Sequence, residues 1–348
     1  MPWKGERDPY KIWLSEIILQ QTRVEQGLPY YEKFIARYPT VQQLADAPED
    51  ELFKLWEGLG YYSRARNLHA AAKFMAVELG GRFPNTYDDI RALKGVGDYT
   101  AAAIASFAFD LPYAVLDGNV YRVLARYFGI DTPTNTPEAK RRFSTLAQQL
   151  LDPERPGAFN QALMDFGATH CRPKQAKCSI CPLQPGCMAF KLGKVAEWPL
   201  KTKKAAKKAR VFLYAVIRHG DDVFIQKRSG KDIWQNLYEF PLLETEQAPA
   251  DKQNAVGQLM SYFFPDTLPP GFQAGQVSKP YRQLLTHQAV TAIFCEFLIP
   301  VQTPEDYFAH PTFKTLQRVS TEKLKKNVAF PRVIVWYLQE NAPTLTLF

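Results

Sequence analysis

The spacing of hydrophobic residues changes near residue 190, which divides the chain into two regions. In the first region, apolar residues recur three and four positions apart, which is the period of an amphipathic helix. Glycine, proline and asparagine separate these periodic segments. We therefore expect a helical domain over residues 1–190. Its predicted helices cover Tyr10–Gln26, Ala65–Leu79, Tyr99–Phe109, Val120–Phe128 and Glu138–Leu150.

The second region begins with an irregular basic stretch and continues with a pattern typical of strands. Residues 191–210 contain eight basic residues and one acidic residue with little periodicity, so we expect a linker there. His219-Gly220-Asp221-Asp222 is a turn signal between two β-rich runs, which predicts a hairpin. We expect a smaller, mixed α/β domain over residues 211–348. Its predicted strands are 211–218, 223–228, 237–243 and 290–299, and its predicted helices are 253–264 and 333–340.

Length and composition agree with two folded domains. The 348 residues are 46% hydrophobic, which is enough for two cores of ordinary size. The net charge of +8 suits a polyanionic partner, although a basic protein without such a partner would carry the same charge. No charged-then-apolar leader is seen, and the longest weakly polar run, Tyr99–Phe109, is far below the ~20 residues that cross a bilayer. We expect a reduced, soluble, cytoplasmic protein that is a monomer.

Four cysteines form the most specific motif of the chain. Cys171, Cys178, Cys181 and Cys187 follow the pattern C-x6-C-x2-C-x5-C on one short segment. Four thiolates this close in sequence can enclose one metal centre, and sulfur ligands suit zinc or an iron–sulfur cluster. The spacing alone leaves both open. The fifth cysteine, Cys295, lies in a strand-like run and is predicted to be a core residue.

A glycine pair connects two helical regions. Gly95-Val96-Gly97 lies inside the segment Leu93–Ala101, just before a predicted helix. Glycines lack side chains, so backbone N–H groups can face a phosphate at a helix N-terminus, and the segment is a candidate DNA-binding hairpin. Tight turns between helices use the same glycines for structural reasons alone, so the pair by itself is weak evidence.

Two carboxyl groups stand in unusually apolar surroundings. Asp117 follows Ala114-Val115-Leu116 and precedes a helix, so it is either a helix cap or a carboxylate set into a buried wall. Glu16 lies in a strongly apolar helical segment and shares a helix face with Gln20. It is either an exposed residue of an amphipathic helix or a buried acid whose raised pKa lets it hold a proton near neutrality.

Five motifs, taken in order, resemble those of one DNA repair superfamily. They are Leu14-Ser15-Glu16 through Gln20-Gln21-Thr22, Gly58-Leu59-Gly60-Tyr61-Tyr62, the Leu93–Ala101 hairpin, Leu116-Asp117-Gly118-Asn119-Val120 and the four-cysteine segment. Together they closely resemble the endonuclease III superfamily of helix–hairpin–helix DNA glycosylases, and within it the MutY-type adenine DNA glycosylases. The resemblance covers residues 2–190 strongly and the C-terminal domain more weakly. It implies a mainly α helix–hairpin–helix glycosylase domain, a [4Fe–4S] cluster on the four cysteines, and a smaller α/β Nudix-like domain.

The resemblance also implies roles for individual residues. Glu16 matches the family's general acid, and Asp117 matches the carboxylate that stabilises the oxocarbenium-like sugar. Tyr99 stands where endonuclease III-like enzymes carry a lysine nucleophile, which implies a monofunctional glycosylase. Together with Asn119, Tyr99 is expected to orient water or to shield the intermediate. The residues implied to bind DNA or the lesion are Leu19, Gln21, Thr22, Tyr61, Gly95 and Gly97, and those implied to form the adenine pocket are Trp3, Gln161, Met164 and Asp165.

The C-terminal domain resembles the Nudix-like module with which MutY proteins recognise 8-oxoguanine. It has no stretch of the type that chelates magnesium in Nudix hydrolases, so nucleotide hydrolysis is not expected. The family reads the lesion through a Phe-Ser-His turn, and Leu285-Thr286-His287 matches it here, with Thr286 and His287 as the implied lesion-binding residues. Leu285 departs from the aromatic residue. Lys4 departs from an arginine near the start of the family's sequences, and the two cations are not interchangeable.

The expected function is excision of adenine from double-stranded DNA in which it is mispaired with 8-oxoguanine or with guanine. One alternative is an endonuclease III-like glycosylase and lyase that acts on oxidised pyrimidines; Tyr99 and the C-terminal domain oppose it. Another alternative is a non-catalytic iron–sulfur protein that binds damaged DNA. The presence of both Glu16 and Asp117 argues against that alternative.

Overall fold

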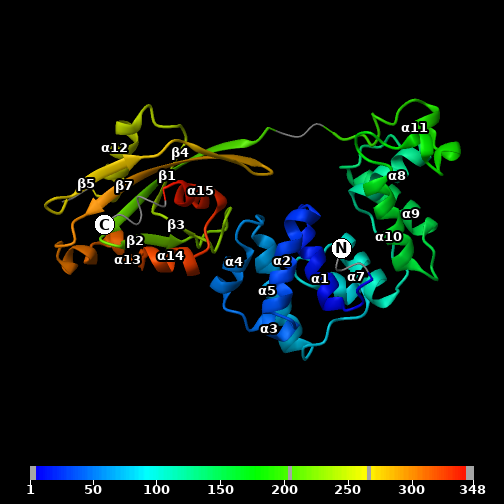
Figure 1. Ribbon diagram of the computed structural model, residues 1–348, viewed down its shortest axis with the longest axis horizontal. Coiled ribbons are helices and arrows are strands. Elements are labelled where there is room, and N and C mark those ends of the chain that lie inside the picture. Colours follow the sequence, from blue (N-terminus) through cyan, green and yellow to red (C-terminus); the bar gives the residue numbers. More distant parts are fainter. Residues whose placement is uncertain (1–4, 203–205, 265–267, 342–348) are drawn as a thin grey trace. The chain divides into compact units, whose positions relative to one another are not determined.

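The computed structural model describes residues 5–202, 206–264 and 268–341 (Figure 1). The chain divides into two units, one formed by Met1–Asp46 with Arg66–Lys204 and the other by Ala47–Ala65 with Ala205–Phe348. The first unit is helical and the second contains an eight-stranded sheet, so the expected fold class is confirmed. Within the described ranges, no helix is long and apolar enough to cross a bilayer.

The helices of the first unit bury the apolar faces that the sequence pattern predicts. Helix α1 (Pro9–Leu19) begins where Asp8 accepts a hydrogen bond of 2.9 Å from the Tyr10 N–H, with Pro9 at the first helical position. Helix α7 (Asp98–Phe109) packs against α1 and α6 (Tyr87–Ala92). Further helices are α2 (Val24–Arg37), α3 (Val41–Ala45), α5 (Ser63–Glu78), α8 (Gly118–Phe128), α9 (Pro137–Leu150), α10 (Pro156–Thr169) and α11 (Met188–Lys191), with 3-10 turns at Cys178–Ile180 and Gln184–Gly186.

One predicted helix has the wrong length. The spacing predicts a single helix over Tyr10–Gln26, but α1 ends at Leu19 and α2 begins at Val24. Gln21 has a left-handed backbone with φ of 55°, and the Thr22 N–H donates to the Leu19 carbonyl at 3.0 Å. The turn brings α2 back onto α1, where a Cβ on Gly27 would lie 2.7 Å from Leu19 Cδ2. Apolar spacing does not reveal this turn, because α1 is apolar on nearly all sides and α2 continues with apolar residues at helical spacing.

The second unit is built on a long parallel pair of strands, β1 (Lys208–His219) and β7 (Gln288–Ile299). The predicted hairpin is present, since β1 pairs antiparallel with β2 (Asp222–Lys227). The predicted strand 237–243 is wrong as one element, because it splits into β3 (Tyr238–Glu239), which pairs with β2, and β4 (Leu242–Thr245), which pairs with β1. The other elements are β5 (Gln273–Val277), β6 (Tyr281–Leu284), β8 (Gln317–Ser320), α4 (Glu49–Trp56), α12 (Lys252–Phe263), α13 (Pro311–Lys314), α14 (Thr321–Asn327), α15 (Arg332–Glu340) and a 3-10 turn at Glu305–Ala309.

Both faces of β1 are buried, which explains why residues 211–217 read as a continuous apolar run. On one face, Leu213 and Ile217 pack with Leu259 of α12. On the other face, the Tyr214 ring stacks on Phe294, and Phe294 stacks on Tyr337 of α15 with ring centroids 4.2 Å apart. The sheet is therefore covered by α12 on one face and by α15 on the other.

Candidate active site

The first unit contains a cavity of about 700 Å³ that is lined by residues of α1, α7, α8 and α10 and by the turn after α1. Its volume falls within the range of cavities that enclose small molecules. Ten of the predicted site residues line it: Glu16, Leu19, Gln21, Thr22, Tyr99, Asp117, Asn119, Gln161, Met164 and Asp165. Trp3 and Lys4 lie outside the described residues.

Glu16 lies on the wall of this cavity and is buried. Burial raises the pKa of its carboxyl group to about 7, a hydrogen bond from Tyr99 opposes that rise, and the negative charge of Asp117 adds to it. Tyr99 is partly buried, and desolvation of its hydroxyl, together with the charges of Glu16 and Asp117, raises its pKa well above the usual value. Glu16 therefore keeps a proton in a large fraction of molecules at neutral pH, and Tyr99 remains a neutral donor.

Asp117 is placed as the N-cap of α8, and its surroundings differ from those of Glu16. Its Oδ1 accepts hydrogen bonds from the backbone N–H groups of Asn119 at 2.8 Å and Val120 at 2.7 Å. Its Oδ2 accepts a third, of 2.7 Å, from Asn119 Nδ2. N–H donors at a helix N-terminus suit an anion. The two carboxyl groups of one cavity thus have different environments: that of Glu16 is desolvated, whereas Asp117 accepts three hydrogen bonds.

A buried arginine connects this carboxylate to the cysteine segment. Arg122 Nη2 donates to Asn119 Oδ1 at 2.9 Å and to the Gly167 carbonyl at 2.6 Å, and its Nε donates to the Cys171 carbonyl at 2.7 Å. Gly167 lies so close to Asn119 that a Cβ there would be 2.7 Å from Asn119 Cβ. The orientation of Asn119, and through it that of Asp117, is therefore fixed by packing and by hydrogen bonds from behind the cavity.

The four cysteines of the motif lie together. Cys171, Cys178, Cys181 and Cys187 line one recess of about 30 Å³. Burial, and then the charges of the other three sulfurs, raise the pKa of the Cys178 thiol. Arg126 Nη1 lies 3.3 Å from Cys171 Sγ and supplies a positive charge. Among the described residues, no three histidine, cysteine or acidic side chains are arranged to hold a single metal ion.

The glycine hairpin lies between α6 and α7, and its glycines are not among the residues that line the cavity. Gly95 has φ of 82°, and a Cβ there would be 2.6 Å from Asn67 Cβ, so the position requires glycine for two reasons. Gly97 is the N-cap of α7 and has no side chain that could accept a hydrogen bond from the helix. The first N–H groups of α7 are therefore left for an external acceptor.

Tyr61 and Thr286 belong to the second unit and contact one another. Their hydroxyl oxygens are 3.0 Å apart although the residues are 225 positions apart in sequence. Tyr61 is 46% exposed and has a left-handed backbone with φ of 47°. Trp56 Nε1 and Arg64 Nη2 both donate to the Gly60 carbonyl, at 3.0 and 3.2 Å, and thereby hold the turn before Tyr61. Thr286 and His287 are exposed in the turn between β6 and β7.

Three residues around the cavity were not predicted. Arg7 lines it and donates to Asp110 Oδ2 at 2.7 Å, and nothing in the local sequence indicates this. Gln20 also lines it and donates to Thr100 Oγ1 at 3.2 Å. Arg122 could have been found, because it follows Asn119 by three positions on an amphipathic helix and such a pair shares a face.

Comparison with known proteins gives two family matches. Residues 14–149 match the HhH-GPD superfamily of base excision DNA repair proteins, and residues 213–340 match the NUDIX domain. An adenine DNA glycosylase of Buchnera aphidicola (subsp. Schizaphis graminum) is 38% identical over 246 residues, which are 71% of this chain and 71% of that protein. The adenine DNA glycosylase of Mus musculus is 45% identical over 199 residues, 55% of this chain and 39% of that protein. The structure of a thermostable thymine-DNA glycosylase matches with a TM-score of 0.52 and 33% identity over 55% of this chain and 88% of that one.

Proposed function

The chain belongs to the adenine DNA glycosylase family of the helix–hairpin–helix base excision repair superfamily, and we propose that it excises adenine mispaired with 8-oxoguanine, and less readily with guanine. The observation that carries the proposal is the pair of carboxyl groups, Glu16 and Asp117, on the wall of one cavity. Burial favours a proton on the first, whose pKa is raised to about 7, and the second accepts hydrogen bonds from the N-terminus of α8. Division of acid and anion roles in this way is the logic of glycoside hydrolysis.

Glu16 acts as the general acid in this proposal. Adenine is a poor leaving group until its N7 is protonated, so a protonated Glu16 donates a proton as the C1′–N9 bond breaks. A pKa of about 7 places Glu16 where it is both available as an acid and strong enough to give the proton up. The Tyr99 hydroxyl, which donates to Glu16, holds the carboxyl group in place.

Asp117 stabilises the sugar, which resembles an oxocarbenium ion once the bond has begun to break, either electrostatically or covalently. Asn119, bonded to the carboxylate, orients water or shields the intermediate. Water then completes the hydrolysis, activated by Glu16 after this residue has lost its proton. Tyr99 cannot form a Schiff base, so the enzyme releases the base without cleaving the strand.

The four cysteines fit an iron–sulfur cluster better than a single zinc ion. Four cysteine sulfurs line the recess, and Cys171 Sγ accepts a hydrogen bond from Arg126. Among the described residues, no three of these side chains are arranged around a single ion, and four cysteine thiolates are the ligands that would hold a [4Fe–4S] cluster. When bound, the cluster would supply mainly structural cross-linking of the segment 171–187, which Arg122 ties to the active site.

Double-stranded DNA is the proposed partner. The hairpin Gly95-Val96-Gly97 offers N–H groups of α7 to a phosphate. Adenine leaves the stack at a cost of a few kcal/mol. In the first unit, Leu19, Gln21 and Thr22 line the cavity and are suited to contact the DNA around the extruded base. In the second unit, the exposed Tyr61 ring is suited to stack on a base. In the same unit, Thr286 and His287 read the 8-oxoguanine through hydrogen bonds. Both residues are exposed, so their polar side chains are accessible to a base.

A strand-resolved adenine-release assay tests the proposal. Matched duplexes carry 8-oxoguanine, guanine or cytosine opposite one adenine, and Glu16→Gln serves as the variant that lacks the acid. We expect release in the order 8-oxoguanine, guanine, cytosine, no release by the variant, and no borohydride-trapped complex. Efficient trapping on a duplex with an oxidised pyrimidine, without adenine release, would replace the proposal by a lyase of the endonuclease III type.

A further inference from the structure

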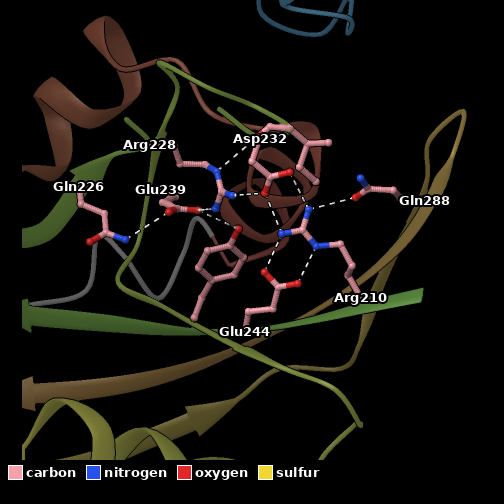
Figure 2. A network of polar contacts seen from close by, with 9 residues as sticks. Arg210, Gln226, Arg228, Asp232, Glu239, Glu244 and Gln288 are labelled. Carbon is pink, nitrogen blue, oxygen red and sulfur yellow. Dashed lines mark hydrogen bonds and ion pairs between the residues drawn. The ribbon is translucent and has the colours of Figure 1, made fainter. Parts of the chain in front are cut away.

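One arginine at the start of β1 is held by two carboxylates at once (Figure 2). Arg210 donates to both oxygens of Glu244 at 2.6 Å, through Nε and Nη2. It also donates to both oxygens of Asp232, at 2.8 Å through Nη1 and 2.7 Å through Nη2. The Arg210 side chain is only 10% exposed, so its position is fixed far more firmly than that of a surface ion pair.

The same guanidinium reaches the segment that contains Thr286. Arg210 Nη1 donates to Gln288 Oε1 at 3.1 Å, and Gln288 directly follows Leu285-Thr286-His287, named here the recognition turn. The backbone of β1 supports the same turn, because the Lys208 N–H donates to the His287 carbonyl at 3.0 Å. The Leu285 N–H closes the turn on the Gln288 carbonyl at 2.8 Å.

A second arginine keeps this arrangement rigid. Arg228 donates to Asp232 Oδ2 at 2.9 Å and to the buried Glu239 at 2.6 Å (Figure 2). Asp232 is therefore fixed from two sides, and Glu239 also accepts hydrogen bonds from Gln226 at 3.1 Å and from the Tyr214 hydroxyl at 3.3 Å. The network joins the interior of the sheet to the guanidinium that supports the recognition turn.

We propose that Arg210 is a positioning residue for 8-oxoguanine recognition, which it serves by fixing the recognition turn through Gln288. The inference rests on the proposed function, since it assumes that Thr286 and His287 read the lesion. A planar fork with five donors serves two carboxylates and an amide together, which an ammonium group cannot do in a fixed geometry. Arginine and lysine carry the same positive charge, so both can neutralise the carboxylates of this site. The recognition turn therefore depends on the planar geometry of the guanidinium group.

The test compares Arg210→Lys with Arg318→Lys in the full chain. Arg318 is a matched control, because it also binds two carboxylates, Asp222 and Glu305, at 2.8 Å each and lies over an aromatic ring, but it contacts β2 and not the recognition turn. Hydrogen exchange of the peptide 281–290 is measured first. We expect exchange there on the order of 10-fold faster in Arg210→Lys, as for the loss of a charge-assisted hydrogen bond, and unchanged in Arg318→Lys. Unchanged exchange in Arg210→Lys overturns the inference whatever the enzyme does.

Adenine release is measured second, on duplexes with 8-oxoguanine or guanine opposite adenine. We expect Arg210→Lys to lower the preference for 8-oxoguanine about 10-fold, and to lower it no further when Thr286→Ala is already present, as for residues coupled in one network. A preference that stays at the wild-type value, or effects of the two substitutions that add, would overturn the inference. If the wild-type protein releases no adenine while exchange in Arg210→Lys rises, the proposed function falls and the structural role of Arg210 stands.

Discussion

Glu16→Gln is expected to abolish adenine release and, at neutral pH, to make the protein more stable. The pKa of Glu16 is raised to about 7 in the folded protein from an ordinary value of 4.5, chiefly by burial. A raised pKa means that the folded state favours the protonated carboxyl group. The stability associated with this proton is fully present below pH 4.5 and is lost as the pH rises toward 7. An amide at this position carries no such pH dependence.

The magnitude follows from the two pKa values. At pH 7 the unfolded chain has ionised Glu16 almost completely, while the folded protein has ionised it by half, which opposes folding by about 3 kcal/mol. At pH 4 the same difference is only about 0.2 kcal/mol. The free energy of unfolding of Glu16→Gln, minus that of the wild-type protein, should therefore increase by about 3 kcal/mol between pH 4 and pH 7.

Urea unfolding of both proteins at several pH values measures this difference. Any constant cost of fitting an amide into the cavity cancels when two pH values are compared, so only the change with pH is informative. Glu138→Gln, at an exposed position of α9, controls for replacing a carboxyl group by an amide. A stability difference between Glu16→Gln and wild type that is constant from pH 4 to pH 8 would refute the assignment of Glu16 as a desolvated acid.

Three further substitutions give independent tests. Tyr99→Phe removes the hydrogen bond that lowers the pKa of Glu16, so the alkaline fall in single-turnover excision should move to higher pH by about one unit; an unchanged midpoint contradicts this. Gly167→Ala places a Cβ 2.7 Å from that of Asn119, and the displacement should slow excision on the order of 100-fold, as misplaced catalytic groups do, while the helical circular dichroism is kept. Wild-type rates would show that Asn119 is not held by this contact. Thr286→Ala should lower the rate on 8-oxoguanine mispairs more than on guanine mispairs, and an equal effect on both would remove the hydroxyl from lesion reading.

The parts of the fold and site that the sequence predicts are those with a local cause. Asp117 stands directly before an amphipathic helix. Its role as N-cap can be predicted from this position, because the N–H groups it binds belong to the next three residues. Glu16 stands among apolar residues on a helix that is buried almost all around, so its burial is visible in the sequence. In both cases the surroundings come from neighbours in the chain.

The remaining parts depend on contacts between distant segments. The backbone of Gln21 is left-handed without a glycine, and only the packing of α2 on α1 accounts for it. The contact between Tyr61 and Thr286 joins residues 225 positions apart, and the pairs of Arg210 join β1 to β4 and to a loop. The type of a residue does not indicate which of the chain's many cationic and hydroxyl side chains it will contact in the folded protein.

The pH dependence of single-turnover adenine excision by the wild-type protein shows whether the protonated form of Glu16 is the active one, because product release does not enter the measurement. With 8-oxoguanine opposite adenine, the rate constant should be highest below pH 7 and should fall about tenfold per pH unit above it, as the acid with a pKa of about 7 loses its proton. A rate constant that stays level to pH 9, or that rises through neutrality, would contradict the role of Glu16 as the proton donor.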